Sequence, residues 1–119
     1  MITHVKFVSI PAEDQDRALE FYTSKLGFEV VTDQPFDEKQ RWIELRIARS
    51  DTRFVLFTPD GTRPGGSFNG ALAADDVERT YGQLSGRGVE FTTPPQKAPW
   101  GTFAVFRDSE GNQFVLSSK

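Results

Sequence analysis

The chain has 119 residues, enough for one compact domain or for two very small halves that cannot fold apart. Its net charge of −3 and its lack of a basic stripe argue against a nucleic-acid partner, and the absence of cysteine excludes disulfides and sulfur-ligated metals. No apolar run approaches the roughly 20 residues of a membrane span, and no signal peptide precedes the first expected strand. We therefore expect no membrane partner and a cytoplasmic location.

The first half of the chain predicts one helix and four strands. A strand is expected over residues 4–10, and Pro11 ends it because proline cannot donate to a ladder. Asp14 is a good N-cap for the helix that follows, and Gly27 is placed to end it. The helix carries apolar residues at every fourth position: Ala18, Tyr22 and Leu26. Further strands are expected over 28–32, 41–48 and 53–58, with a polar loop over 33–39.

The second half predicts the same order of elements. A strand over 68–73 precedes a helix that Asp75 and Asp76 cap and that Gly86 and Gly88 end. The apolar stripe of this helix consists of Val77, Tyr81 and Leu84. Strands are expected over 89–92, 103–107 and 113–117, with a proline-rich loop over 93–99 and a turn at 108–111 in which Gly111 is free to take a positive φ.

An internal repeat relates the two halves. Phe54-Val55-Leu56 returns 60 residues later as Phe114-Val115-Leu116. Three further pairs are 61 residues apart: Asp14 and Asp75, Gly27 and Gly88, Glu29 and Glu90. Each half has the order βαβββ, so we expect a module used twice within a single domain 1–119. The first module spans about 1–58, a linker without hydrophobic residues spans 59–67, and the second module spans about 68–119.

Several motifs carry a resemblance to a known family. They are Ile10-Pro11-Ala12-Glu13-Asp14, the run from Arg17 to Tyr22, Leu26-Gly27-Phe28, Trp100-Gly101, and the run from Asp108 to Asn112. Together they resemble the vicinal oxygen chelate superfamily, which includes glyoxalase I, bleomycin-resistance proteins and extradiol dioxygenases. Ser109 departs from the pattern, since proline is usual there. The resemblance implies an α+β fold of two tandem βαβββ modules, with helices on the convex side of curved mixed sheets that form a cavity.

The resemblance also implies where a divalent metal would bind in the enzymes of this superfamily. Four strands would each supply a His, Glu or Gln side chain, and the matching positions here are Phe7, Val55, Asn69 and Val115. These residues are a poor set of ligands, so we expect no metal cofactor. His4 is the only histidine, and strand parity places it on the face opposite Phe7, which favours a structural or surface role.

Other side chains are candidates for binding a ligand. Trp42, Glu44 and Arg46 share one face of the strand over 41–48, and strand parity leaves open whether this face lines the cavity. Glu44 is either a desolvated acid or base, or the partner of Arg46 in an ion pair.

The remaining candidates are polar and aromatic. Asn69 and Gln113 either orient a ligand by hydrogen bonds or are satisfied polar residues of their strands. Trp42, Phe57 and Trp100 either stack on a flat ligand or fill the core, and Trp100 is the strongest candidate because a proline-rich loop brings it to the rim.

These observations favour a metal-independent binder of a small molecule, held in an aromatic-lined cavity partly closed by Trp100 and the loop 33–39. The net negative charge suits a cationic ligand. Two enzymatic alternatives remain. One is a metal-dependent glyoxalase-type or dioxygenase-type enzyme with displaced ligands, in which His4 and Glu44 converge, and the other is a metal-free enzyme with Glu44 as base. We also expect a homodimer, because two short modules leave much apolar edge to cover.

Overall fold

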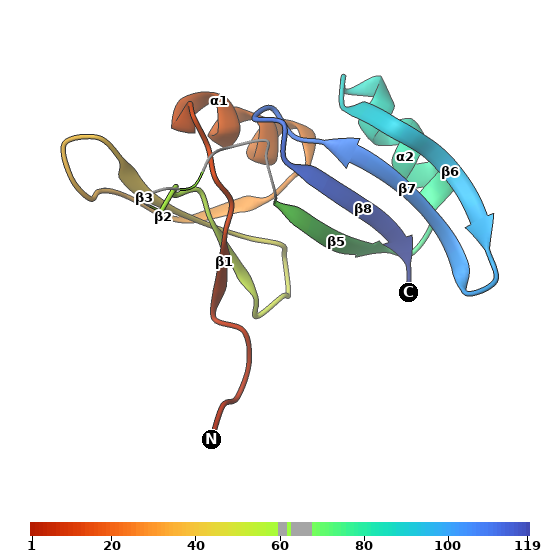
Figure 1. The fold of residues 1–119 in the computed structure, drawn as a ribbon, viewed down its shortest axis with the longest axis horizontal. Helices are drawn as coiled ribbons and strands as arrows, with labels where there is room; N and C mark the ends of the chain where they lie inside the picture. The colour runs from red at the N-terminus through yellow and green to blue at the C-terminus, as the bar shows by residue number, and fades with distance from the viewer. Residues whose placement is uncertain (60–61, 63–67) are drawn as a thin grey trace.

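The computed structural model describes residues 1–59, 62 and 68–119, and it contains two four-stranded sheets that lie side by side (Figure 1). Sheet A has the strand order β1-β4-β3-β2, with bounds Phe7–Ser9 (β1), Glu29–Pro35 (β2), Arg41–Arg46 (β3) and Arg53–Val55 (β4). Sheet B has the order β5-β8-β7-β6, with bounds Asn69–Ala74 (β5), Glu90–Ala98 (β6), Gly101–Arg107 (β7) and Gln113–Ser118 (β8).

The two sheets have the same topology. In each, the first strand pairs in parallel with the last strand of its half, and the other pairs are antiparallel. One helix follows the first strand of each half, so both halves have the order βαβββ. The fold class predicted from the repeat is therefore confirmed. The expected linker lies largely outside the described residues.

Helix caps lie where the sequence predicts them. Asp14 accepts a hydrogen bond from the Arg17 N–H at the start of α1 (Gln15–Glu20), and Asp76 does the same for the Arg79 N–H at the start of α2 (Val77–Gly86). Gly27 and Gly88 take φ values of 78° and 89° after the two helical segments, a conformation that favours glycine.

The first helix is not uniform, which its apolar stripe does not predict. A π-helical segment, η1 (Phe21–Lys25), continues α1, and the Leu26 N–H bonds to the carbonyl of Phe21. The wider turn brings Phe21 and Tyr22 into the core together, whereas Leu26 is only half-buried. A regular 3.6-residue spacing therefore describes the buried side of this helix only in its first turns.

The prediction of a proline-rich loop over 93–99 is wrong, because most of this segment belongs to strand β6. The strand continues to Ala98, and its pairing with β7 shifts register between Thr93 and Gln96, where the two prolines lie. Because β6 is an edge strand, prolines at such an irregularity cost little backbone pairing. Other strand ends also differ: β1 and β4 are shorter than the expected strands over 4–10 and 53–58, and β2 extends to Pro35.

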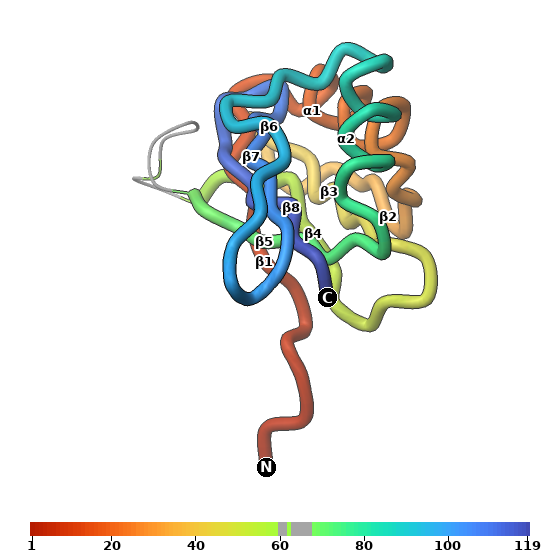
Figure 2. The backbone as a smooth tube through the Cα atoms, turned by 90° about the vertical axis from the view of Figure 1, so that its right-hand side faces the viewer, coloured from red at the N-terminus to blue at the C-terminus, as the bar shows by residue number. Residues whose placement is uncertain are grey.

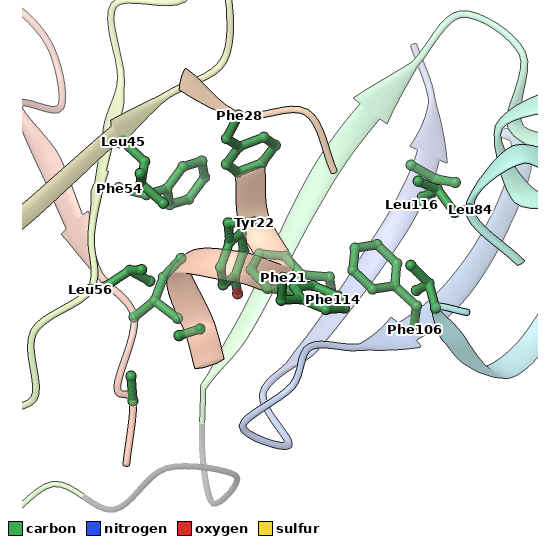
Figure 3. Packing of buried hydrophobic residues seen from close by; sticks show 14 of the residues in the cluster. Phe21, Tyr22, Phe28, Leu45, Phe54, Leu56, Leu84, Phe106, Phe114 and Leu116 are labelled. Carbon is green, nitrogen blue, oxygen red and sulfur yellow. The ribbon is translucent and has the colours of Figure 1, made fainter. Parts of the chain in front are cut away.

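A row of aromatic rings forms the centre of the core and crosses from one half to the other (Figure 3). The Phe28 ring stacks on Phe54 at 5.6 Å and contacts Tyr22 at 5.5 Å, measured between ring centroids. Tyr22 contacts Phe114 at 6.2 Å, and Phe114 stacks on Phe106 at 5.4 Å. Phe54 and Phe114 are the equivalent residues of the internal repeat, so the repeated tripeptide places a ring of each half in one shared core.

Polar contacts join the halves beside this row. Tyr22 Oη donates to Asp108 Oδ2 at 2.5 Å, and Asn112 Nδ2 donates to the Pro11 carbonyl at 2.7 Å. Arg17 Nε lies 2.8 Å from Glu110 Oε2. We call these three contacts the inter-module contacts. They tie α1, η1 and the segment after β1 to the β7–β8 turn. The N-terminal residues, by contrast, extend away from the body of the molecule (Figure 2).

Candidate functional site

Each sheet has one face covered by a helix and one open face. On β3, Ile43 and Leu45 belong to the buried core, so Trp42, Glu44 and Arg46 point to the open face of sheet A. This resolves the question that strand parity left open.

Four aromatic side chains gather on or beside this open face, and we call them the aromatic cluster: Phe7, Phe36, Trp42 and Phe57. The Trp42 ring centroid lies 5.4 Å from Phe7, 6.0 Å from Phe36 and 5.3 Å from Phe57. Phe36 and Phe57 are 4.8 Å apart in an edge-to-face contact. The cluster is only half-buried, since Phe7 remains 38% exposed and Phe36 58% exposed. Half-exposed rings in contact form an apolar surface on which a flat molecule can stack.

Val55 forms the floor beneath these rings. It pairs with Ser9 on β1 and with Glu44 on β3, so its side chain points to the open face. It is nevertheless completely buried, and the rings of Phe7 and Trp42, from the two flanking strands, meet across it. Hydrocarbon at this position means that Val55 itself offers no ligand for a metal, although Ser9 and Glu44 flank it on the neighbouring strands.

Glu44 has a different partner from the one considered in the sequence. Arg53 Nη1 lies 3.3 Å from Glu44 Oε2, across the β3–β4 ladder, while Arg46 pairs with Glu29 at 2.8 Å. The interpretation of Glu44 and Arg46 as an ion pair is therefore wrong. Arg46 lies directly opposite Glu29 on β2, and Glu44 finds the diagonal neighbour Arg53 on β4, so both side chains pair across a ladder instead of along β3. The Glu44 and Arg53 side chains are about one-quarter exposed, at 25% and 29%.

The β2–β3 turn positions Phe36. The Phe36 N–H bonds to the Gln40 carbonyl, and the Asp37 carboxylate accepts from the N–H groups of Lys39 and Gln40 at 2.8 Å. The N–H groups of Gln40 and Lys39 lower the pKa of Asp37, since both bonds favour the charged carboxylate. The turn is thus held by a charged Asp37 at neutral pH.

Sheet B contributes the other predicted polar residues. Asn69 and Gln113 are paired neighbours on β5 and β8, and both are exposed on the open face. Val115 lies on the same face two residues further along β8, beside Val105. The structure therefore brings Asn69 and Gln113 together at one end of the open face of sheet B, where Arg107 lies directly opposite Gln113.

Trp100 is not near the aromatic cluster. It lies in the β6–β7 turn, where its ring stacks on Phe103 at 5.7 Å and remains 62% exposed. This turn is at the opposite side of the molecule from the β2–β3 turn (Figure 1). Trp100 and the loop 33–39 therefore do not close one cavity within a single chain.

The four positions where the superfamily's enzymes bind metal lie on the open faces, Phe7 and Val55 on sheet A and Asn69 and Val115 on sheet B. Their side chains do not fit a divalent ion, because three are hydrocarbon and the fourth is an amide. His4 is exposed in the N-terminal arm, where its Nδ1 is 3.0 Å from Thr3 Oγ1. Across residues 1–59, 62 and 68–119, no three His, Asp or Glu side chains are grouped so that they could hold a metal ion.

Two hollows lie elsewhere on the molecule. One of about 660 Å³ opens between the start of α1 and the start of β3, and its lining is mainly polar. The Gln15 amide in this hollow donates to the carbonyls of Arg41 and Leu56 and accepts from the Arg41 N–H. Its hydrogen bonds therefore serve to hold the start of β3 in place. The second hollow, of about 410 Å³, lies between the modules on the helix side, with an apolar lining that includes Phe28, Leu72 and Phe106.

Two residues of the aromatic face were missed in the sequence. Phe36 lies in the expected polar loop 33–39. A single phenylalanine among polar and charged residues is the sequence feature that could have pointed to it. Arg53 opens β4, and only the register of β3 against β4 places it near Glu44.

No helix among the described residues is long and apolar enough to span a membrane.

Two tandem βαβββ modules, with helices on one side and open faces on the other, define a recognised class of fold. A family model described as the Glyoxalase/Bleomycin resistance protein/Dioxygenase superfamily matches residues 2–116. The chain belongs to this superfamily, as its motifs predicted.

Similar proteins include one curated relative and two solved structures. YetH of Bacillus subtilis is 31% identical over 118 residues, covering 98% of both chains. A crystal structure of a superfamily member from Sphaerobacter thermophilus has 35% identity and a TM-score of 0.89, covering 99% of this chain and 98% of that one. The structure of TnmS3 from a Streptomyces species, described as an antibiotic binding protein, has 37% identity and a TM-score of 0.89, covering 98% of this chain and 96% of TnmS3.

Proposed function

We propose that this protein binds a small molecule on the open face of sheet A, that binding needs no metal, and that the protein does not catalyse a reaction of the molecule. The observation that carries the proposal is the aromatic cluster, whose half-exposed rings lie over a buried Val55 where the superfamily's enzymes have a metal ligand. A surface of this kind holds a flat molecule by stacking and apolar burial but has little means of polarising it.

The polar candidates would orient the ligand. Glu44 and Arg46 border the cluster on β3, and Asn69 and Gln113 offer amide donors and acceptors on sheet B. The description of TnmS3 as an antibiotic binding protein supports a binding role, because the likeness extends over nearly the whole of both chains at 37% identity.

A homodimer is part of the proposal. The β6–β7 turn, which contains Trp100, lies on the opposite side of the molecule from the β2–β3 turn (Figure 1), so Trp100 would act on a ligand held by a second copy. Among the described strands, β5 pairs only with β8, and its other edge carries small uncharged side chains that do not prevent pairing with another chain. Light scattering should give a mass twice that of the chain, and a monomer at micromolar concentration would contradict this part.

The main test is a crystal structure of protein purified without added ligand, together with metal analysis of the same sample. We expect density for a small molecule against Trp42 and Phe57, and less than stoichiometric zinc, nickel, iron or manganese. Trp42→Ala should lose the retained molecule, as native mass spectrometry can show. A stoichiometric cation held by side chains of β1, β4, β5 and β8 would contradict the proposal and favour the metal-dependent enzyme.

A further inference from the structure

We infer that the ligand of the aromatic cluster is an uncharged flat aromatic molecule that carries a hydrogen-bond donor and an acceptor side by side, as a carboxamide does. The inference rests on the proposed function, because it names the chemical class that the same face would select. It is carried by the Glu44–Arg53 pair, which lies beside the rings.

The position of the pair places it within reach of a stacked ligand. Glu44 is two residues from Trp42 on the same face of β3, a spacing of roughly 6–7 Å along a strand. Arg53 pairs with Phe7 across the β1–β4 ladder, and Phe7 contacts the Trp42 ring. A two-ring molecule stacked on Trp42 therefore brings its edge to the ion pair.

The Glu44–Arg53 ion pair can form hydrogen bonds with both a donor and an acceptor of the ligand. Its single described hydrogen bond joins Arg53 Nη1 to Glu44 Oε2 at 3.3 Å. The guanidinium has five N–H donors and the carboxylate has two acceptor oxygens, so further N–H groups and Oε1 remain for a ligand. A carboxamide carbonyl accepts from Arg53 while its N–H donates to Glu44, and the ion pair itself stays intact.

The charge on this face is balanced, although the chain as a whole carries −3. Glu44 is paired with Arg53, and Arg46 is paired with Glu29. A cationic ligand is attracted by Glu44 but repelled by Arg53. An anionic ligand is attracted by Arg53 but repelled by Glu44. Neither ligand therefore gains a net ionic contact while the pair stays intact, and separating the pair would leave one charge without a partner. This argues against the cationic ligand expected from the net charge.

Four probes that share one ring system test the inference: 2-naphthamide, 2-naphthoate, 2-naphthylmethylammonium and naphthalene. Binding is followed by the indole N–H signals in ¹H–¹⁵N correlation spectra, of which the chain has two, from Trp42 and Trp100. Each is assigned with a Trp→Phe variant. We expect the amide to shift the Trp42 signal and to bind at least about fivefold more tightly than the other three probes, because this uncharged probe alone makes a hydrogen bond to each member of the pair without breaking the pair.

Charge-removing variants should invert this order. Glu44→Gln leaves Arg53 unpaired, so 2-naphthoate should become the tightest probe, and Arg53→Gln should favour the ammonium probe. Asp33→Asn is the matched control, because it removes an ion pair with Arg41 from the same sheet on the helix-covered face. The control should keep the amide preference of the unmodified protein.

The outcomes separate the inference from the proposed function. If a charged probe binds the unmodified protein most tightly, or if naphthalene binds as well as the amide, the inference is overturned while binding at the cluster stands. A preserved amide preference in both Glu44→Gln and Arg53→Gln would also overturn the inference. If no probe shifts the Trp42 signal, the inference and the proposed function both fail.

Discussion

Tyr22 is the residue at which the two halves of the molecule meet most closely. Its ring lies between Phe28 and Phe114, and its hydroxyl donates to the buried Asp108 carboxylate at 2.5 Å. Burial and then the neighbouring Asp108 charge hold the pKa of Tyr22 above its usual range. The hydroxyl is therefore a permanent donor at any ordinary pH, and its role is structural.

Replacing Tyr22 by phenylalanine tests that role. The variant removes one hydrogen bond to a buried carboxylate and keeps the ring, so we expect a loss of about 1.5–3 kcal/mol in the free energy of unfolding. Urea denaturation measures it. Tyr81→Phe is the control, since the Tyr81 ring packs on Phe91 and no hydrogen bond of its hydroxyl is described. Equal losses in the two variants would show that the Asp108 contact contributes nothing.

At the scale of elements, the two helices end alike and differ inside. Gly27 and Gly88 both stand at positive φ after the last turn, whereas only the first helix contains a π segment. N-cap residues and helix-ending glycines act on residues that are close to them in the chain, so the sequence alone predicts them. The π segment depends on two adjacent rings, Phe21 and Tyr22, both finding space in the core, which is a tertiary condition.

Two glycine variants should have opposite effects on stability. Gly27→Ala introduces no steric contact within 4 Å but forces alanine to a φ of 78°, which should cost about 1–2 kcal/mol. Gly82→Ala also meets nothing within 4 Å, and it lies inside α2, so it should stabilise by up to about 1 kcal/mol. Thermal and urea unfolding of both variants measure the difference. A stabilising Gly27→Ala would contradict the account of the helix end.

At the scale of the whole molecule, the halves share one core and are also joined by charge. Burial by itself raises the pKa of Glu110, but hydrogen bonds from Arg17, the Asp14 N–H and Ser109 outweigh it, and the pKa is lowered from its usual value. A lowered pKa means that Glu110 stabilises the folded protein above the pKa of the unfolded chain, and that this stability is lost as pH falls through the folded pKa.

Glu110→Gln should therefore destabilise the protein in a pH-dependent way. We expect a loss of about 1–3 kcal/mol at pH 7, because the variant breaks charge-assisted bonds between the modules, and a smaller loss in acid, as the pH falls through the lowered pKa of Glu110. Urea unfolding at several pH values measures the difference between the two proteins. A difference that stays constant as the pH is lowered from 7 into the acid range where the protein unfolds would contradict the assignment of the stabilisation to the charged Glu110.

The sequence by itself determined the repeat, the order βαβββ, both N-caps and the superfamily. These features depend on periodicity, on turn residues and on motifs whose parts lie close together in the chain. It also singled out Phe7, through the resemblance, and Trp42 and Phe57, as aromatic residues able to stack on a ligand. It missed the strand character of the proline-rich segment 93–99, since an edge strand tolerates prolines that a central strand would not.

Only the tertiary structure decided which side chains meet. Strand register gave Glu44 the partner Arg53 instead of Arg46, and the shape of the β2–β3 turn added Phe36 to the aromatic cluster. The packing of the two halves placed the β6–β7 turn, which contains Trp100, on the opposite side of the molecule from the β2–β3 turn (Figure 1). Register and packing are set by contacts between segments far apart in the chain, and no local pattern contains that information.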